Sequence, residues 1–520
     1  MGDASPIHFL NIFGELSSMA NEPATATSQN HFDLIVIGGG PGGYVGAIRA
    51  AQLGKRVACV ERNKLGGVCL NWGCIPTKAL LHTAKVYREA FGHGADLGLE
   101  VDPKAVRVNW EKVIGRSRTV SGQLNSGIGF LLKKNKIEHV VGHAKILAGT
   151  SAAGLCRVQV SAADENYYAG TGKTAATDRV LTADRVLIAT GAAPRQLAFA
   201  PNDGTTIISS YEAMILAKRP QRMIVVGSGA IGMEFAYFYN AFGTTVTVIE
   251  MLDRILPLED ADISKAAQKI FEKQGITFRT NFATKAVEKT AAGVRVTIEN
   301  MSDKKTECVE CDVVLVAIGV QGRTDGLADA SLGLKMDRGL IATDYRTIKD
   351  KATYQTSVAG VYAIGDVIGP PALAHVASEE AVVAVERMFG HHSIGIDYDS
   401  IPGATYCNPQ IASVGMTEQA AKEKGLKYHI GAYQLKSHGK AIADGVNEGL
   451  VKVITGEPYG EILGAHIVGD NASELIHEIC LAKRLEATAE DVITTMHAHP
   501  TMAESIHEAV LASEGRAIHG

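Results

Sequence analysis

The sequence predicts an α/β protein that carries two copies of one βαβ unit. In each copy, a short β-branched run leads into a glycine-rich turn, a helix follows, and a second strand ends in a glutamate. The first glycine and the glutamate are 23 positions apart in both copies, from 38 to 61 and from 227 to 250. Such a shared spacing indicates a repeated fold. The residues of the pattern are Gly38, Gly40, Pro41, Gly43 and Glu61 after the strand Phe32–Ile37, and Gly227, Gly229, Gly232 and Glu250 after the strand Met223–Val226.

The chemistry of the pattern indicates dinucleotide binding. The glycines permit a tight turn and bring a pyrophosphate close to the helix N-terminus, and the terminal acid accepts hydrogen bonds from a ribose. Two copies therefore predict two Rossmann-like dinucleotide-binding domains in one chain. A carboxylate at the position of Glu250 suits a ribose 2′-hydroxyl and repels a 2′-phosphate, which favours NAD over NADP. No arginine immediately follows Glu250; Arg254, four residues later, is expected at most to contact the cofactor without selecting a phosphate.

Length and composition exclude several classes of protein. A chain of 520 residues has room for about three or four domains. Its net charge is −5, and no basic block of the kind that binds nucleic acid or anionic lipid is present. No apolar run reaches the roughly 18 residues that a membrane span needs. The longest apolar runs, Val313–Val320 and Arg185–Ala189, are interpreted as buried parallel strands.

Residues 1–30 contain no lysine or arginine but include Asp3, Glu15 and Glu22. A secretory signal needs a basic start, and a mitochondrial presequence is rich in arginine and poor in acids. We therefore interpret this segment as a flexible leader, or as an upstream start before Met19. The sequence favours a bacterial-type cytoplasmic location, with an organelle matrix as the alternative.

Eight cysteines in a chain of this size favour a reducing compartment. Cys69 and Cys74 lie four residues apart just after the first glycine-rich turn, which suggests a redox-active disulfide that exchanges electrons with a bound flavin. Cys74 precedes a predicted helix at 77–86, whose dipole favours the thiolate. The alternatives are a structural disulfide and half of a zinc site, but no further zinc ligands are nearby. The pair Cys308 and Cys311 is interpreted as incidental, and no metal site is predicted.

The segment His497–Glu504 contains a candidate acid–base group. Pro500 fits the first position of a helix that runs through Leu511, which places His499 at the helix entrance. Glu504 lies about one turn further on, where a carboxylate fixes the tautomer of an imidazole. Thiol–disulfide exchange needs such a base. With 17 histidines in the chain, these residues alone favour a structural histidine or a His-x-His metal pair.

Together these segments resemble the dihydrolipoamide dehydrogenases, members of the class I pyridine nucleotide-disulfide oxidoreductases. The resemblance extends from about residue 33 to about residue 514. Its most specific parts are the segment Gly66–Leu81 around the cysteine pair and the segment His497–Glu504. Shorter matching motifs are Ala189–Gly191, Ala317–Gly319, Ala363–Asp366 and Ala372–His375.

The resemblance implies a role for each candidate catalytic residue. Cys69 is expected to be the exposed sulfur that the dithiol substrate attacks, and Cys74 the flavin-side sulfur that forms a charge-transfer thiolate. His499 is expected to be the acid–base group, oriented by Glu504. An ion pair near the reactive edge of the flavin is expected from Lys78 and Glu234.

The resemblance also implies the cofactors, FAD and NAD, and the residues that contact them. Asp366 is expected to bind the ribityl chain, and the helix that starts near His375 is expected to point its N–H groups at the flavin. The expected FAD contacts are Gly38, Gly40, Pro41, Gly43, Glu61, Gly67, Lys78, Ala144, Thr190, Gly191, Asp366, Leu373, Ala374 and His375, and the expected NAD contacts are Gly227, Gly229, Gly232, Glu250 and Gly319.

The domain plan follows from the same resemblance. A leader (1–30) precedes an FAD domain (31–191), an NAD domain (192–312), a central segment that completes the FAD site (313–395) and an α+β dimer interface domain (396–520). Members of the family are homodimers in which the histidine completes the active site of the opposite subunit. The implied partners are the lipoyl domains of 2-oxo acid dehydrogenase complexes.

Three rival functions are weighed against this interpretation. Glutathione-type reductases tend to carry a lysine where this chain has Thr77, and they prefer NADPH. Mercuric reductases usually end in a vicinal cysteine pair, which the segment 516–520 lacks. A scaffold or surface-binding role without catalysis is disfavoured because the cysteine pair, His499 and Glu504 are intact. Trp72, Cys311 and Cys407 depart from the usual residues of the family.

Overall fold

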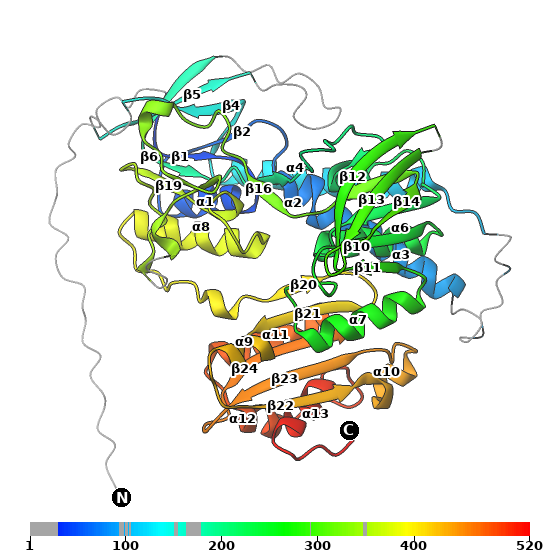
Figure 1. Cartoon of the computed structure of the whole chain (residues 1–520). Helices are drawn as coiled ribbons and strands as arrows, with labels where there is room; N and C mark the ends of the chain where they lie inside the picture. Colours follow the sequence, from blue (N-terminus) through cyan, green and yellow to red (C-terminus); the bar gives the residue numbers. More distant parts are fainter. Residues whose placement is uncertain are drawn as a thin grey trace, which may run out of the picture.

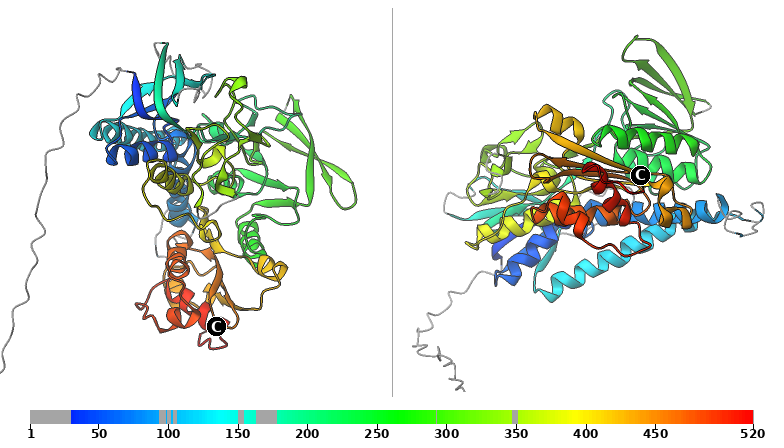
Figure 2. Two further views of the ribbon diagram at one scale, coloured as in Figure 1. Left: turned by 90° about the vertical axis from the view of Figure 1, so that its left-hand side faces the viewer. Right: turned by 90° about the horizontal axis from the view of Figure 1, so that it is seen from below.

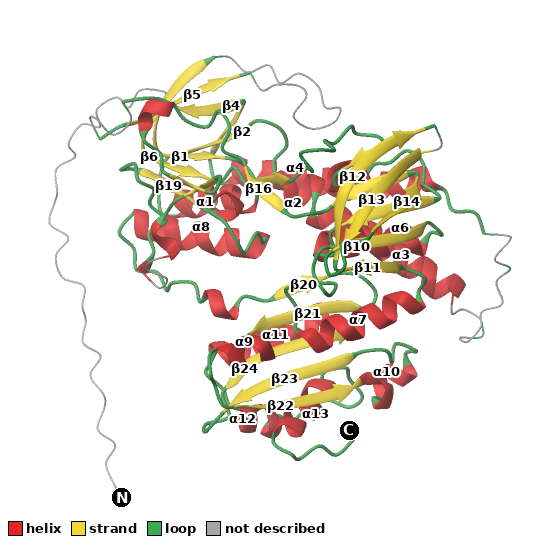
Figure 3. Cartoon of the chain, in the orientation of Figure 1, coloured by secondary structure: helices red, strands yellow, loops and turns green. Residues whose placement is uncertain are grey.

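Three bodies, each built on its own β-sheet, make up the part of the chain that the structure describes (Figure 1). The computed structural model describes residues 30–92, 98, 102, 106–149, 154–162, 178–291, 293–346 and 351–519. The predicted leader lies outside these residues, apart from residue 30. We name the three sheets the N-terminal, the central and the C-terminal sheet. Helices pack on all three of them (Figure 3).

The N-terminal sheet has the order β3-β2-β1-β6-β5-β4, with β19 beside β6. Its β1, β2, β3, β6 and β19 run parallel, and β4 and β5 form an antiparallel edge. Helices α1 (Pro41–Gln52) and α8 (Ala374–Met388) pack together, joined by a hydrogen bond from Arg49 Nε to Glu386 at 2.9 Å. The strands are β1 (His31–Ile37), β2 (Val57–Glu61), β3 (Glu138–Val141), β4 (His143–Ile146), β5 (Cys156–Ser161), β6 (Arg179–Ile188) and β19 (Val361–Ala363).

The central sheet is parallel throughout and has the order β11-β10-β9-β15-β8. An antiparallel three-stranded sheet, β12-β13-β14, adjoins it. The central strands are β8 (Ile207–Ile208), β9 (Arg222–Val226), β10 (Thr245–Glu250), β11 (Thr277–Thr280) and β15 (Val313–Val316); the others are β12 (Phe282–Thr290), β13 (Gly293–Asn300) and β14 (Thr306–Cys311); the helices are α5 (Ser210–Ala213), α6 (Ala230–Ala241) and α7 (Ala261–Lys273).

The C-terminal sheet is antiparallel and has the order β20-β21-β24-β23-β22. Helix α7 of the central body lies beside β23 and β24 of this sheet (Figure 1). The elements are β20 (Gly403–Thr405), β21 (Gln410–Gly415), β22 (Tyr428–Gln434), β23 (Leu450–Gly456), β24 (Ile462–Gly469), α9 (Glu418–Glu423), α10 (Gly439–Ala443), α11 (Ala472–Arg484), α12 (Ala489–Thr494) and α13 (Glu504–Ser513).

Two long helices connect the N-terminal and central bodies. Helices α3 (Cys74–Gly92) and α4 (Trp110–Lys134) pack against each other, and α3 also packs on α6 (Figure 2). The indole Nε1 of Trp110 donates a hydrogen bond to the carbonyl of Leu216 at 2.7 Å. Strands β7 (Ala192–Pro194) and β16 (Val320–Gly322) pair where the chain passes between the bodies, and β17 (Met336–Asp337) pairs with β18 (Leu340–Ile341) further along the chain. Among the described residues, no helix is long and apolar enough to span a membrane.

The two βαβ units predicted from the glycine pattern are confirmed, and they share their backbone geometry. Gly38 and Gly227 have φ of +106° and +100°, a region that disfavours side chains. A Cβ at Gly38 would lie 2.3 Å from the Ala189 carbonyl oxygen, and one at Gly227 would lie 2.4 Å from that of Ala317. The motifs at 189–191 and 317–319 thus occupy equivalent places beside the two turns.

The predicted strand Val313–Val320 is shorter in the structure. Strand β15 ends at Val316, and Gly319 has φ +97°, so the chain turns there. Val320 begins β16 instead, which pairs with β7. The uniform apolar character of this run concealed the turn, because Ala317 and Ile318 are apolar although they lie outside the strand.

Replacing Gly43 by alanine should destabilise the protein, because the new Cβ would lie 1.8 Å from the Gly38 carbonyl oxygen. Backbone would have to move, and we expect a loss of about 2–3 kcal/mol. The midpoint of thermal unfolding, followed by circular dichroism, measures this. Gly127→Ala is the matched control, since a Cβ there meets nothing within 4 Å; it should leave the midpoint unchanged or raise it. Equal midpoints for both variants would contradict the packing argument.

Candidate active site

One cavity of about 510 Å³ lies where the two βαβ units face each other. Its walls come from the first glycine turn, the cysteine pair, the second glycine turn, and the segment that leads into α8. The structure thus brings together most of the residues expected to contact the cofactors or to react. These are Gly38, Gly40, Pro41, Glu61, Gly67, Cys69, Cys74, Lys78, Ala144, Thr190, Gly191, Gly229, Glu234, Gly319, Asp366, Leu373 and Ala374.

Seven expected site residues do not line this cavity. Gly43 and Gly232 pack against the carbonyls of Gly38 and Gly227, so they shape the turns from behind. His375 has its Nε2 3.1 Å from the Pro402 carbonyl oxygen. The complete set is Gly43, His375, Gly227, Gly232, Glu250, His499 and Glu504.

The two acids at the strand ends make equivalent hydrogen bonds. Glu61 Oε2 accepts the Gly39 N–H at 2.7 Å, and Glu250 Oε2 accepts the Ser228 N–H at 2.9 Å. Ser228 adds a bond from its hydroxyl at 2.8 Å. Each carboxylate therefore lies against its own glycine turn, where the ribose of a dinucleotide is held in this type of fold.

The cavity fits two dinucleotides. A Cβ on the second glycine of each turn would project into open space: that of Gly229 meets no atom within 4 Å, and that of Gly40 meets only Gly67 Cα at 3.8 Å. These glycines leave room for a pyrophosphate at the N-termini of α1 and α6. Burial raises the pKa of the Asp366 carboxyl. The Asp366 N–H and the charge of Arg323 act in the opposite direction but do not cancel this rise. A buried carboxyl on the cavity wall suits the hydroxyl groups of a bound cofactor.

The cysteine pair is held at a break between two helices. Cys69 lies in α2 (Gly67–Trp72), Gly73 ends that helix with φ −151°, and Cys74 is the first residue of α3. The prediction that Cys74 stands at a helix N-terminus is confirmed. Both sulfurs are free thiols in the structure.

The two thiols differ in acidity because they interact with each other. A hydrogen bond from Cys69 lowers the pKa of Cys74 to about 7, against the opposing effect of burial, and the charge of Lys78 lowers it further. The same hydrogen bond, with burial, raises the pKa of Cys69 far above its ordinary value. Cys74 is thus the residue that carries the thiolate when both are reduced.

Lys78 and Glu234 form an ion pair across the cavity. Lys78 Nζ lies 2.9 Å and 3.1 Å from the two carboxylate oxygens of Glu234, whose side chain is 5% exposed. Glu234 also accepts the Tyr406 N–H at 3.0 Å, and the Lys78 ammonium lies 4.4 Å from the centre of the Tyr406 ring. The ion pair therefore joins α3, α6 and the start of the C-terminal body.

His499 and Glu504 are paired but lie apart from the cavity. The distance from His499 Nδ1 to Glu504 Oε1 is 2.9 Å, and the His499 side chain is 79% exposed. Burial opposes a lower pKa of Glu504, but the Thr501 N–H and His499 outweigh it and hold that pKa below its usual value. This is the arrangement that fixes an imidazole tautomer.

The helix predicted to start at Pro500 begins later. Helix α13 starts at Glu504 and runs to Ser513. Glu504 Oε2 accepts the N–H of Thr501 at 2.8 Å, and the Thr501 hydroxyl bonds to the Ala498 carbonyl. These bonds hold the residues before Glu504 in turns, so His499 lies on a loop ahead of the helix.

Several cavity residues were not anticipated from the sequence, among them Arg323, Tyr211 and Trp72. The Arg323 guanidinium donates to the Ala192 carbonyl at 2.8 Å and to the Tyr211 hydroxyl at 2.9 Å, and both side chains reach the cavity wall. Trp72, noted only as an unusual residue, also lines it. The position of Arg323 four residues after Gly319 was the one available signal; Tyr211 offered none.

Among the described residues, no group of three His, Cys, Asp or Glu side chains is placed to hold a metal ion. Cys308 is exposed and Cys311 is buried, so the two thiols of that motif differ in environment.

Comparisons with known proteins agree with this geometry. Residues 32–381 match the pyridine nucleotide-disulphide oxidoreductase family, and residues 401–510 match its dimerisation domain. The chain belongs to this family. It is 44% identical to a dihydrolipoyl dehydrogenase of Rhizobium etli over 94% of this chain and 99% of that one. A mitochondrial dihydrolipoyl dehydrogenase of Pisum sativum is 38% identical over 95% of this chain and 94% of that one. The crystal structure of LpdA from Mycobacterium tuberculosis has a TM-score of 0.81 and 27% identity, covering 92% of this chain and 98% of that chain.

Alkylation of the reduced protein should show Cys74 reacting with a midpoint near pH 7. Lys78→Met should move that midpoint up by about one pH unit, because the variant removes a cation that stabilises the thiolate. Peptide mass spectrometry after iodoacetamide treatment at a series of pH values measures the midpoint. Lys85→Met, on the same helix and paired with Asp470, is the control. The electrostatic account is wrong if both variants, or neither, shift the midpoint.

Proposed function

We propose that this protein is a dihydrolipoyl dehydrogenase, which catalyses dihydrolipoamide + NAD⁺ → lipoamide + NADH + H⁺. The observation that carries the proposal is the cysteine pair on the wall of the cavity that both βαβ units share. A dithiol substrate, a disulfide and two dinucleotides can exchange electrons only if their reacting atoms meet in one place. The names of the Rhizobium and Pisum relatives support this choice within the family.

FAD and NAD are the cofactors, and bound FAD would supply the chemistry that links a two-electron thiol couple to hydride transfer to NAD⁺. The first glycine turn and Glu61 would hold FAD, together with Asp366 and the N-terminus of α8. The second glycine turn and Glu250 would hold NAD. Among the residues that the structure describes, no basic side chain bonds to Glu250, and its carboxylate favours a free ribose 2′-hydroxyl.

The chain's own residues account for the thiol chemistry. In the oxidised protein, Cys69 and Cys74 share a disulfide; one substrate thiolate attacks the Cys69 sulfur, and Cys74 leaves as a thiolate. The second substrate sulfur, once deprotonated, closes the lipoamide disulfide and releases Cys69 with the electron pair, so the enzyme gains two electrons and the substrate loses two. The low pKa of Cys74 makes it the better leaving group, and Lys78 stabilises the charge it carries.

His499 would remove the substrate proton in the active site of the opposite subunit. Its side chain is largely exposed and lies within the matched dimerisation domain, outside the cavity of its own chain. Glu504 would hold the imidazole so that Nε2 faces the substrate thiol. A homodimer with two shared active sites follows from this arrangement.

Lipoyl domains of 2-oxo acid dehydrogenase complexes would present the dithiol to the cavity. A bacterial-type cytoplasmic location is proposed, with an organelle matrix as the alternative; the Pisum relative is named mitochondrial. We also propose the domain bounds that the family resemblance implies, which are 31–191 for the FAD domain, 192–312 for the NAD domain, 313–395 for the central segment and 396–520 for the dimer interface domain.

Cys74→Ser should abolish lipoamide turnover and the long-wavelength absorbance of the thiolate–flavin contact, because no disulfide can form. His499→Gln should slow reduction of the flavin by dihydrolipoamide by about 10²–10⁴-fold, the usual contribution of a general base. Reduction of the flavin by NADH should be little changed. Stopped-flow absorbance of each half-reaction measures the rates.

The control for His499→Gln is His519→Gln, since His519 Nδ1 also pairs with a glutamate, Glu508, at 2.8 Å. That variant should react at the wild-type rate in both half-reactions. Equal slowing of the dithiol and NADH half-reactions by His499→Gln would remove its assigned role, and turnover by Cys74→Ser would refute the disulfide mechanism.

Hybrid dimers test the sharing of the active site. A dimer of one Cys74→Ser subunit and one His499→Gln subunit should contain one complete site, built from the intact disulfide of one chain and the intact histidine of the other. Random assembly of equal amounts should restore about a quarter of wild-type turnover. If each histidine served its own chain, every hybrid would stay inactive. Separately purified, unmixed variants provide the baseline.

A further inference from the structure

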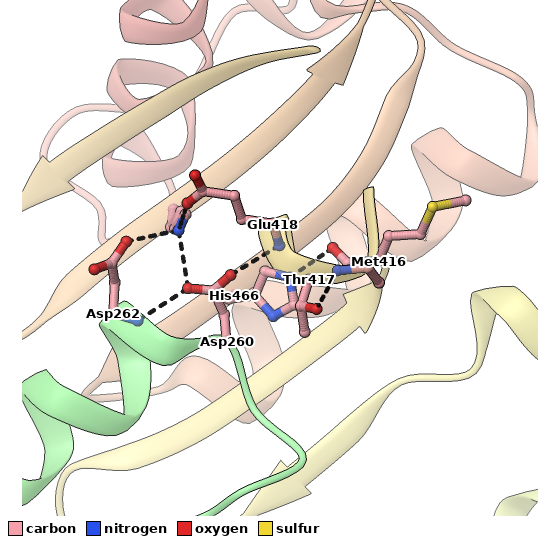
Figure 4. A network of polar contacts seen from close by, with 8 residues as sticks. Asp260, Asp262, Met416, Thr417, Glu418 and His466 are labelled. Atoms are coloured by element: carbon pink, nitrogen blue, oxygen red, sulfur yellow. Dashed lines mark hydrogen bonds and ion pairs between the residues drawn. The ribbon is translucent and has the colours of Figure 1, made fainter. Parts of the chain in front are cut away.

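Lys452 is a buried lysine that three carboxylates surround. Its side chain is 2% exposed, and its Nζ lies 2.9 Å from Asp260, 2.6 Å from Asp262 and 2.6 Å from Glu418. Figure 4 shows these three acidic residues close together. Although burial opposes it, these hydrogen bonds hold the pKa of Lys452 well above its ordinary value. A cation in this position is stable only while its partners stay in place.

The cluster connects two of the three bodies. Lys452 lies on β23 and Glu418 on α9, both in the C-terminal body, while Asp260 caps α7 of the central body. The Asp260 carboxylate accepts the N–H of Asp262 and the N–H of Glu418, both at 3.0 Å. The Asp260 carboxylate thus bonds to residues of both bodies.

Two neighbouring side chains extend the junction. The Ser413 hydroxyl of β21 bonds to Glu259, whose pKa is raised by burial. His466 of β24 has its Nε2 2.9 Å from the Met416 carbonyl, and burial lowers its pKa. The C-terminal body therefore contacts the two consecutive residues Glu259 and Asp260.

These two residues end the loop that starts at Glu250. The Leu252 N–H bonds to the Glu250 carboxylate at 3.0 Å, and the Leu256 N–H bonds to the Ser228 carbonyl at 3.1 Å. Leu256 has φ +47°, a strained conformation for a leucine that its surroundings must maintain. The loop therefore runs from the proposed ribose acid, along the second glycine turn, to the Lys452 cluster.

We propose that Lys452 is a positioning residue for NAD, acting from the C-terminal body through the loop 251–260 on Glu250 and Ser228. The proposal rests on the proposed role of Glu250 in binding the NAD ribose. Lys452 fixes Asp260, and Asp260 fixes the start of α7. The loop 251–260, which connects Glu250 to α7, then holds the Glu250 carboxylate against the second glycine turn. The C-terminal body thus contributes to the NAD site as well as to the dimer.

The test compares two variants that remove a lysine from the same junction. Lys452→Met removes the buried cation, whereas Lys273→Met removes an exposed lysine at the far end of α7, where it pairs with Glu448 of the C-terminal body. Flavin reduction by NADH is followed over a range of NADH concentrations in the FAD-loaded dimer. Lys452→Met should raise the half-saturating NADH concentration roughly tenfold, a loss of about 1.4 kcal/mol in binding. Lys273→Met should leave it unchanged.

Asp262→Asn is a milder second variant, since Asp262 is 58% exposed and its loss leaves the buried Asp260 in contact with Lys452. This variant should raise the half-saturating NADH concentration two- to threefold. The rate of flavin reduction by dihydrolipoamide should stay at the wild-type value. The proposal is overturned if Asp262→Asn binds NADH normally, if Lys273→Met has the same effect as Lys452→Met, or if the dithiol half-reaction weakens in proportion. The NADH-binding readouts need no dithiol, so they stand even if the wild-type protein fails to oxidise dihydrolipoamide.

Discussion

The ion pair between Lys78 and Glu234 is the contact on which the arrangement of the active site depends. It joins a helix of the N-terminal body to a helix of the central body, and the Tyr406 N–H adds the C-terminal body at the same carboxylate. Glu234 is almost fully buried, so loss of its cation would leave an uncompensated charge, at a cost of about 3–5 kcal/mol. The same lysine lowers the pKa of Cys74. One contact thus fixes the relative position of the bodies and sets the acidity of the reactive thiol.

The two βαβ units supply equal backbone and different chemistry. Each uses a first glycine with positive φ against a strand-end carbonyl, and a terminal acid bonded to the next residue of the turn. What differs is what each unit places beside its turn. The first is followed by the cysteine pair, and the second carries Glu234 on the helix that begins at its turn. The two units therefore bind dinucleotides in the same way, and each adds one feature of its own to the reaction: the first adds the cysteine pair and the second adds Glu234.

The sequence predicted well the features that are local in the chain. The turns, the terminal acids and the position of Cys74 at a helix start each depend on fewer than 30 consecutive residues. The helix expected at Pro500 was wrong because side-chain hydrogen bonds from Thr501 and Glu504 favour turns there, which a residue pattern does not reveal. The prediction of a strand through Val320 was wrong because apolar residues continue beyond the end of the strand at Val316.

Contacts between distant segments could not be predicted from the residues alone. Lys452 and Asp260 are 192 positions apart, and the residues around neither of them predict the contact. Tyr211 and Arg323 meet at the cavity wall over 112 positions. The pairing of Lys78 with Glu234 came from the family resemblance, not from spacing. Burial and tertiary packing decide such contacts, and they act on the folded chain as a whole.

The assignment of substrate and cofactor is tested most directly by an initial-rate assay of the purified yellow protein. Dihydrolipoamide is supplied with NAD⁺, in parallel with NADP⁺ and with a third reaction of NADPH and glutathione disulfide. The structure predicts fast NADH formation, little activity with NADP⁺ because Glu250 repels a 2′-phosphate, and none with glutathione disulfide. Rapid NADPH-dependent reduction of glutathione disulfide, without oxidation of dihydrolipoamide, would contradict the account.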